Sequence, residues 1–222
     1  MIQRIHTAVS GPRKMRETSL TALLPILRTG DLVLFSGRGM VARSIRFLTN
    51  CHWSHVGMVV HDLQADRLLI WEATTFSNVA DVDSGQIHRG VALVPLVDKI
   101  TRYPGDVAIR RIDYALISEA RLKRLETMIR ILRNAPYRNY LRGHLLSYWW
   151  PKRRWAGPRA GTFCSELVAV AYQRLGALPR DGVPAVRAVP ADFMRLRALR
   201  GALSAPIRVR DEPEVRTSHR QS

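Results

Sequence analysis

The residues of this chain best suited to chemistry centre on a cysteine at the start of an apolar segment, GTFCSELVAVAYQRLG (residues 161 to 176). The pattern predicts a helix that begins near Cys164, where the first backbone N–H groups stabilise a thiolate. A cysteine inside a core behaves instead as a small hydrophobic residue. The choice between a nucleophile and a structural thiol depends on whether the chain supplies a base.

A cysteine nucleophile needs a base within hydrogen-bonding distance, and the base needs a third group that orients its ring. His55 begins a predicted strand (55 to 62) that forms an antiparallel hairpin with a second one (67 to 74). With the turn centred just after Leu63, Glu72 lies directly opposite His55. Glu72 interrupts an otherwise apolar strand, where an unpaired carboxylate is costly. Its partner is therefore either His55 or one of the many arginines.

Other residues near these three are candidates for contacting a substrate. Trp53 and Ser54 directly precede His55, and Trp53 either lines the cleft or packs in the core. The segment SYWWPKRRW (147 to 155) places Trp149 and Trp150 beside basic residues. Aromatic rings beside cations suit a membrane interface or a base-stacking surface, although the same residues could pack over the cysteine helix.

A group of zinc-binding residue types surrounds the base: Cys51, His52, His55 and His61. Structural zinc sites usually carry two ligand pairs, and this spacing has no second pair. We therefore expect no metal and no cofactor. Cys51 ends a predicted helix and has no helix N-terminus behind it, so we expect a far less reactive thiol there.

Length and composition indicate one folded domain. The 222 residues are 46% hydrophobic and 24% charged, and 35 Lys and Arg against 18 Asp and Glu give a formal net charge of +17. This charge favours anionic partners such as nucleic acid or anionic lipid. We expect a flexible basic N-terminus (1 to 18), a catalytic domain (19 to 204) and a polar tail (205 to 222).

The cellular location follows from two absences in the sequence. The apolar run near the N-terminus is short, contains Pro25 and lacks a cleavage site, and no run is long enough to span a bilayer. Two cysteines do not make a disulfide framework in a chain of this size. We therefore expect a cytoplasmic protein, with peripheral attachment to a membrane as an alternative.

The order of expected elements is typical of an α+β protein. A helix from Ser19 to Gly30 is followed by a strand (30 to 35) and a helix (37 to 50) whose Met40, Ile45 and Leu48 lie roughly on one side. After the hairpin, strands are predicted at 90 to 98 and 106 to 112, where Pro95 places the first at a sheet edge. Ser118 then begins a longer helix, and the cysteine helix comes late in the chain.

Four motifs in this order, GDLVLF, SHVGMVV, WEAT and FCSELVAVAY, resemble the circularly permuted branch of the NlpC-type papain-like superfamily. This branch includes the YiiX/YaeF-like amidase group and, more distantly, the lecithin:retinol acyltransferase group. The resemblance covers roughly residues 25 to 195. It implies a permuted papain-like fold in which an antiparallel sheet packs against helices that include the nucleophile helix.

Carried onto this chain, the resemblance implies that Cys164 is the nucleophile, His55 the general base and Glu72 the orienting residue. It also matches Tyr137 to an aromatic position ahead of the cysteine motif. The Gly30-Asp31 turn and the stretch that begins at Pro190 are further landmarks. The Trp-rich and Arg-rich segment 138 to 159 and the high net charge go beyond the pattern.

These features predict a thiol hydrolase that forms an acyl-enzyme, with peptidase or amidase activity on an amide bond, such as one in a cell-wall-type peptide. An alternative is a lipid acyltransferase, thioesterase or phospholipase-like enzyme at an anionic membrane. A third hypothesis is an inactive basic protein that binds nucleic acid. The joint presence of all three catalytic matches argues against it.

Overall fold

The computed structural model describes residues 15–75, 77–133, 135–136, 163–178, 185–195 and 203–210. Seven strands lie in this part of the chain: β1 (Arg16–Ser19), β2 (Leu32–Ser36), β3 (His55–Asp62), β4 (Arg67–Thr74), β5 (Gly90–Pro95), β6 (Asp106–Arg110) and β7 (Ile207–Arg210). The helices described are α1 (Leu20–Leu23), α2 (Met40–Thr49), α3 (Leu96–Thr101), α4 (Glu119–Ile131), α6 (Cys164–Leu175) and α7 (Pro190–Arg195). Short 3-10 turns are η1 (Leu24–Ile26), η2 (Tyr114–Leu116) and η4 (Ala185–Arg187).

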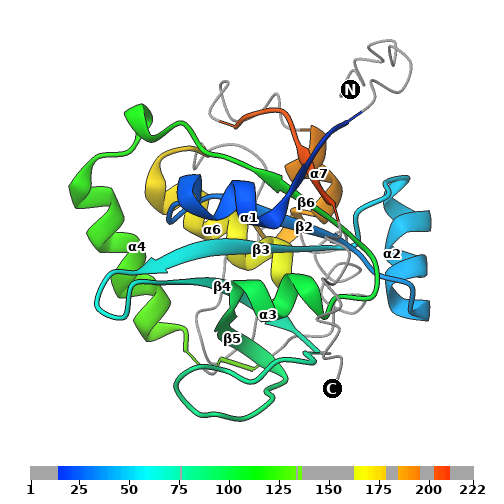
Figure 1. Cartoon of the computed structure of the whole chain (residues 1–222), viewed down its shortest axis with the longest axis horizontal. Coiled ribbons are helices and arrows are strands. Elements are labelled where there is room, and N and C mark those ends of the chain that lie inside the picture. The colour runs from blue at the N-terminus through cyan, green and yellow to red at the C-terminus, as the bar shows by residue number, and fades with distance from the viewer. Residues whose placement is uncertain are drawn as a thin grey trace, which may run out of the picture.

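The strands form one mixed sheet in the order β1-β7-β6-β2-β3-β4-β5. The pairs from β7 to β5 are antiparallel, and only β1 and β7 run parallel. Figure 1 shows the long β3 and β4 crossing the middle of the molecule, with α4 and α2 at opposite ends. The predicted α+β class is confirmed by this mixture of one sheet and surrounding helices.

Helices cover both faces of the sheet. Alternate residues along each strand point to opposite sides, and the central strands carry apolar side chains on both. Leu34, Met58 and Trp71 face α4 and α6, and their cluster includes Cys164. Val33 and Ile70 belong to a second cluster with residues of α1 and α3 on the other side. The central strands are therefore buried on both faces, and their side chains are fixed by packing on each side.

The hairpin of β3 and β4 has the predicted bounds but a different register. Asp62 pairs with Arg67 and Met58 with Trp71, so the turn is centred between Gln64 and Ala65. Asp62 accepts hydrogen bonds from the N–H groups of Gln64 and Ala65 and stabilises this wider turn. The predicted pairing of His55 directly opposite Glu72 is therefore wrong. The shift is two residues, so both side chains stay on the expected common face.

The Gly30-Asp31 turn joins three elements that surround the site. The Asp31 carboxylate accepts hydrogen bonds from the N–H of Arg28 at 3.0 Å and of Ile112 at 2.8 Å. The Tyr172 hydroxyl of α6 donates to the Gly30 carbonyl at 2.6 Å. Burial raises the pKa of Asp31, and the hydrogen bonds from these two backbone N–H groups oppose that effect. The turn thus fixes α6 against β2 and the end of β6.

Two boundaries differ from the sequence prediction. The helix expected from Ser19 to Gly30 is only the four-residue α1 followed by η1, which contains Pro25. The strand expected at 90 to 98 ends at Pro95, and the chain continues as α3. Pro95 does lie on an edge strand, as predicted.

The two ends of the predicted catalytic domain omit strands of the sheet. Residues 16–19 form β1 and residues 207–210 form β7, and the two strands pair with each other. β7 also pairs with β6, which joins both segments to the central sheet. The boundaries expected at 19 and 204 therefore leave out backbone that belongs to the fold.

Candidate active site

Cys164 is the first residue of α6, and its position follows from the chain entering the helix in an extended conformation. Phe163 is the N-cap residue, and both side chains are buried, with Cys164 3% exposed. The Ser165 hydroxyl donates to the Ala188 carbonyl at 2.6 Å, which ties the first turn to the segment before α7. The thiol thus lies where orphan N–H groups and the positive end of the helix dipole meet.

His55 is the first residue of β3 and lies where the sheet ends. Its Nε2 lies 2.7 Å from Oε2 of Glu72, and its ring centroid is 5.5 Å from that of Phe35 on β2. Because Nε2 faces the carboxylate, Nδ1 remains free of it, and the Cys164 side chain lies close enough to the ring to raise the pKa of His55. The His55 imidazole thus lies between the Glu72 carboxylate and the Cys164 side chain.

The electrostatics of His55 favour a charged imidazolium. Burial by itself lowers the pKa of His55, but the Cys164 thiolate and the Glu72 carboxylate together raise it to about 9. His55 is therefore protonated at neutral pH when Cys164 is ionised. This is the ion pair that a thiol nucleophile requires.

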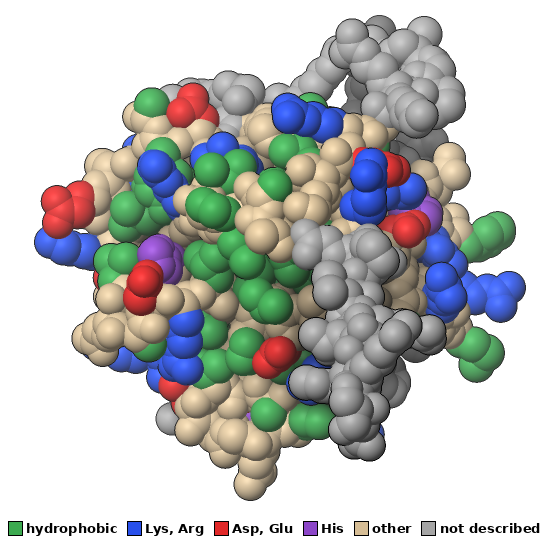
Figure 2. Space-filling model, in the orientation of Figure 1, with side chains coloured by type: hydrophobic (Ala, Val, Ile, Leu, Met, Phe, Trp, Pro, Cys, Tyr) green, Lys and Arg blue, Asp and Glu red, His purple; other side chains and the backbone are tan. Residues whose placement is uncertain are grey.

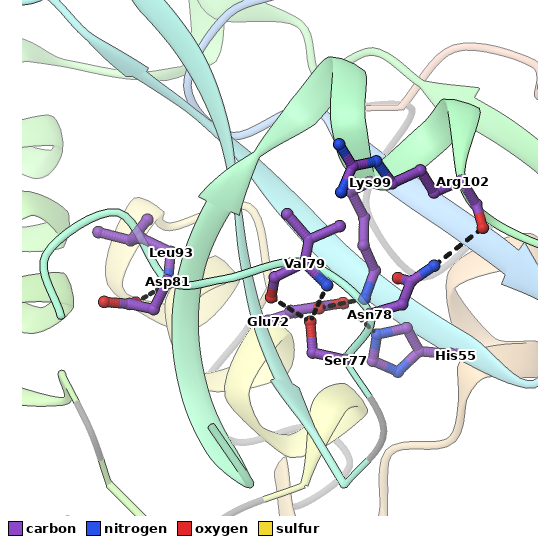
Figure 3. Close-up of polar contacts among 9 residues, drawn as sticks. All are labelled: His55, Glu72, Ser77, Asn78, Val79, Asp81, Leu93, Lys99 and Arg102. Carbon is purple, nitrogen blue, oxygen red and sulfur yellow. Dashed lines mark hydrogen bonds and ion pairs between the residues drawn. The ribbon is translucent and has the colours of Figure 1, made fainter. Parts of the chain in front are cut away.

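Glu72 is fully buried and has a second partner, Lys99 of α3. Lys99 Nζ lies 2.5 Å from Oε1 of Glu72, and the two side chains are 2% and 0% exposed. Burial raises the pKa of Glu72, but Lys99 and His55 outweigh it and lower the pKa to about 2. Figure 3 shows the Glu72 carboxylate between the Lys99 ammonium and the His55 ring. Glu72 is thus held ionised and oriented by two cations.

Gly57 lies directly opposite Glu72. Met58 pairs with Trp71 in the antiparallel ladder of β3 and β4, and Gly57 and Glu72 are the next pair along it. A Cβ atom on Gly57 would lie 2.6 Å from Cγ2 of Ile70 and 3.5 Å from Cβ of Glu72. This close approach explains the glycine of the SHVG motif.

Gly57→Ala should lower the free energy of unfolding by about 1 to 3 kcal/mol, because overpacking forces neighbouring side chains to move. It should also slow reactions of Cys164 if these depend on His55, because the Glu72 side chain beside Gly57 is hydrogen-bonded to His55. Urea unfolding and thiol alkylation measure the two effects. Gly39→Ala is the control for overpacking, because its Cβ would meet nothing within 4 Å and only the smaller effect of alanine at the N-cap of α2 is expected. Parent-like behaviour of Gly57→Ala would contradict the role of this close packing.

Tyr103 is a further polar group beside the site. Its ring lies 4.7 Å from that of Phe35, and its hydroxyl packs close to Gly37. Burial raises the pKa of Tyr103, and the negative charges of Glu72 and Cys164 raise it further against the opposing effect of Arg46. Tyr103 is therefore a neutral phenol that can donate a hydrogen bond near Cys164.

Trp53 and Ser54, which were predicted to contact a substrate, are both buried and contact other parts of the fold. Trp53 is 1% exposed and packs in the core, which agrees with the packing alternative. The Ser54 hydroxyl accepts from the Gly37 N–H at 3.1 Å and donates to the Phe35 carbonyl at 3.4 Å. Ser54 thus joins the end of β2 to the start of β3. Tyr137, Trp149 and Trp150 lie outside the described residues, as does the segment 138 to 159.

The histidines near the base each pair with a different carboxylate. His52 Nε2 lies 2.6 Å from Asp106, and His61 Nε2 lies 3.1 Å from Asp66. Within the described ranges, no three His, Cys, Asp or Glu side chains are grouped so that they could hold a metal ion. Cys51 and Cys164 are both free thiols.

Two residues of this site were not anticipated: Lys99 and Tyr103. Both follow Pro95, in a stretch whose first residues were predicted as strand, so its helical face was not considered. A lysine between apolar neighbours in LVDKI is the signal that could have indicated a buried cation.

Comparisons with known proteins bear on the fold. No family model matches the chain, and no curated protein matches it by sequence. Its architecture is an α+β fold. Among solved structures, the metalloprotein YiiX of Escherichia coli O157:H7 is similar, with a TM-score of 0.50 and 18% sequence identity. The match covers 83% of this chain and 97% of YiiX. The two proteins therefore share a fold, at a distance.

Proposed function

We propose that this protein is a cysteine hydrolase of the permuted papain-like type, with Cys164 as nucleophile, His55 as general acid and base, and Glu72 as the orienting carboxylate. The observation that carries the proposal is that His55 is hydrogen-bonded to Glu72 and lies close enough to Cys164 for that side chain to raise its pKa. The fold shared with YiiX supports the proposal. The same sequence motifs predicted both a YiiX-like fold and these three catalytic residues. The buried Lys99 adds a cation beside Glu72.

The proposed reaction begins with attack of the Cys164 thiolate on a carbonyl carbon, which forms a C–S bond and an oxyanion. The backbone N–H of Cys164 and the Tyr103 hydroxyl are the proposed oxyanion donors. The His55 imidazolium then gives its proton to the leaving nitrogen as the C–N bond breaks. This step leaves a thioester and a neutral imidazole.

Release of the acyl group uses the same residues in reverse. Neutral His55 takes a proton from water, whose oxygen attacks the thioester carbon. The C–S bond then breaks, the carboxylic acid leaves, and the ion pair of Cys164 and His55 is restored. Glu72 keeps the His55 ring in one orientation during both halves.

The substrate we propose first is an amide, such as a peptide bond, because protonation of a leaving amine is the task for which a charged His55 is suited. An acyl ester or thioester of a lipid is the second candidate. It is favoured by α2, which lies beside the site and exposes large apolar side chains. Within the described residues, no helix is long and apolar enough to cross a membrane.

The rate of hydrolysis should fall as pH rises through about 9, where His55 loses the proton that the leaving group needs. The sign follows from the raised pKa of His55: the acid form persists below about 9 and is lost above it. A profile of kcat/KM against pH measures this limb. A rate that keeps rising well above pH 9 would contradict a protonated His55.

A substrate trap tests the proposed function. Cys164→Ala should retain substrate without turning it over, and mass spectrometry of ligands captured from mixed peptides and lipids would identify the class. The parent should convert the same compounds, with an acid product that carries the acyl group. Equal turnover by the parent and Cys164→Ala would contradict the proposal.

A further inference from the structure

The helix α2 exposes an unusual number of large apolar side chains. Met40 is 83% exposed, Phe47 86% and Leu48 65%. The sequence pattern indicated that Met40, Ile45 and Leu48 share one side, but only Ile45 is buried. Met40, Ser44, Phe47 and Leu48 follow the spacing i, i+4, i+7 and i+8, which places them along one face of a helix. The apolar face of α2 therefore points mainly away from the protein.

Basic residues accompany this apolar face. Arg38 precedes α2, Arg43 and Arg46 lie within it, and residues 37 to 50 contain no acidic residue. Arg43 and Arg46 line an open groove together with Ser44, Phe47 and Leu48. Figure 2 shows apolar and basic side chains projecting side by side at the edge of the molecule where Figure 1 places α2. We call Arg38, Met40, Arg43, Phe47 and Leu48 the α2 surface.

The α2 surface is tied to the candidate active site by the buried side of the helix. Ile45 packs against Phe163, the residue directly before Cys164. The Arg46 guanidinium donates to the Ser36 hydroxyl at 3.2 Å, at the end of β2. The chain then leaves α2 at Asn50 and reaches His55 five residues later. A molecule held on this surface would therefore lie next to the thiol.

We propose that the α2 surface docks the protein onto an anionic phospholipid bilayer. Three large apolar side chains would enter the region between headgroups and acyl chains, where an amphipathic helix gains by burying its apolar face. The neighbouring arginines would pair with lipid phosphates, whose sign complements a chain of net charge +17. This docking does not depend on the proposed catalysis.

Charge and apolar surface together favour a membrane over other occupants. Nucleic acid would use the arginines but would leave Met40 and Phe47 without an apolar environment. A second copy of this chain would cover the apolar side chains but would bring the same arginines together. An anionic bilayer is the occupant that satisfies both parts of the surface.

Sedimentation with phosphatidylcholine vesicles, with and without phosphatidylglycerol, tests the proposal. The parent should bind the anionic vesicles, and Met40→Ser with Phe47→Ser and Leu48→Ser should weaken binding at least about tenfold, because three apolar contacts are lost. The matched control replaces three other exposed residues, Leu63, Ile87 and Ile131, with serine. This control should bind as the parent does.

A second pair of variants isolates the charges. Arg38→Gln with Arg43→Gln should weaken binding to anionic vesicles, while Arg124→Gln with Arg130→Gln on α4 should not. Figure 1 places α4 and α2 at opposite ends, so the control pair lies far from the docking surface. Cys164→Ala should bind as the parent does, which separates docking from catalysis.

Several results would overturn the proposal. One is a parent that does not bind anionic vesicles, and another is equal binding by the α2 variants and their controls. Self-association of the parent that the apolar α2 variant loses, without vesicle binding, would identify a dimer surface instead. An oligonucleotide could instead bind through the arginines alone and prevent vesicle binding. That result would identify a nucleic-acid surface. Unchanged thermal unfolding of each variant shows that folding is intact.

Discussion

His55→Ala should slow the alkylation of Cys164 by iodoacetamide at pH 6 by about a hundredfold. The reagent reacts with the thiolate, and an unassisted thiol is only about 0.3% ionised at that pH. In the parent, Cys164 and Glu72 raise the pKa of His55 to about 9, so an imidazolium lies beside the sulfur at pH 6 and would stabilise a negative charge there. Removing the ring leaves the helix N-terminus as the remaining support for a thiolate at a site that is 3% exposed.

Two internal comparisons control this experiment. Cys51 should react more slowly than Cys164 in the parent and should not change in His55→Ala. His52→Ala removes a nearby histidine that pairs with Asp106 instead, so it should leave the rate at Cys164 unchanged. Peptide mapping after a short exposure assigns the label to each cysteine. Equal rates in the parent and His55→Ala would remove the case for an activated thiol.

Lys99→Met should lower the free energy of unfolding by about 3 to 5 kcal/mol, because it leaves the fully buried Glu72 with one cation instead of two. For a chain of this size the melting temperature should fall by about 6 to 20 °C if unfolding is reversible. Lys123→Met is the matched control. Lys123 pairs with Glu119 at the surface, where both side chains are more than 70% exposed, so its loss should change stability little.

A double variant separates the effect of Lys99 on stability from its effect on reactivity. Glu72→Gln with Lys99→Met removes both charges of the buried pair and should recover much of the lost stability. It should still react slowly at Cys164, because a neutral glutamine no longer holds the His55 imidazolium. The alkaline limb of the pH profile should also move below 9, since Glu72 helps to raise the pKa of His55. A double variant with parent-like alkylation would contradict the positioning role of Glu72.

The sequence pattern predicted the strands that carry His55 and Glu72 because alternation and turn residues are local signals. Both strands have the expected bounds, 55 to 62 and 67 to 74. The register was wrong by two residues because it depends on the conformation of the turn. Asp66 adopts a left-handed φ of 43° in a turn that Asp62 stabilises. The prediction that His55 and Glu72 share one face of the sheet is still correct, because a register shift of two residues leaves each side chain on the same face.

Lys99 and the exposed face of α2 could not be predicted in the same way. Lys99 reaches Glu72 from a helix far along the chain, and a lysine in an apolar stretch does not reveal its partner. Met40 and Leu48 have the spacing of a core-facing helix, and the pattern does not show whether that face is covered. Tertiary packing decides both.

The direct measurement of the central claim is the mass of a trapped acyl-enzyme. The parent should be mixed with a p-nitrophenyl acyl ester, quenched with acid after one turnover and digested for mass spectrometry. The account predicts one added acyl group on the peptide that contains Cys164, and none on Cys164→Ala. Hydrolysis of the ester at the same rate by Cys164→Ala, or an acyl group found on Cys51 instead, would contradict it.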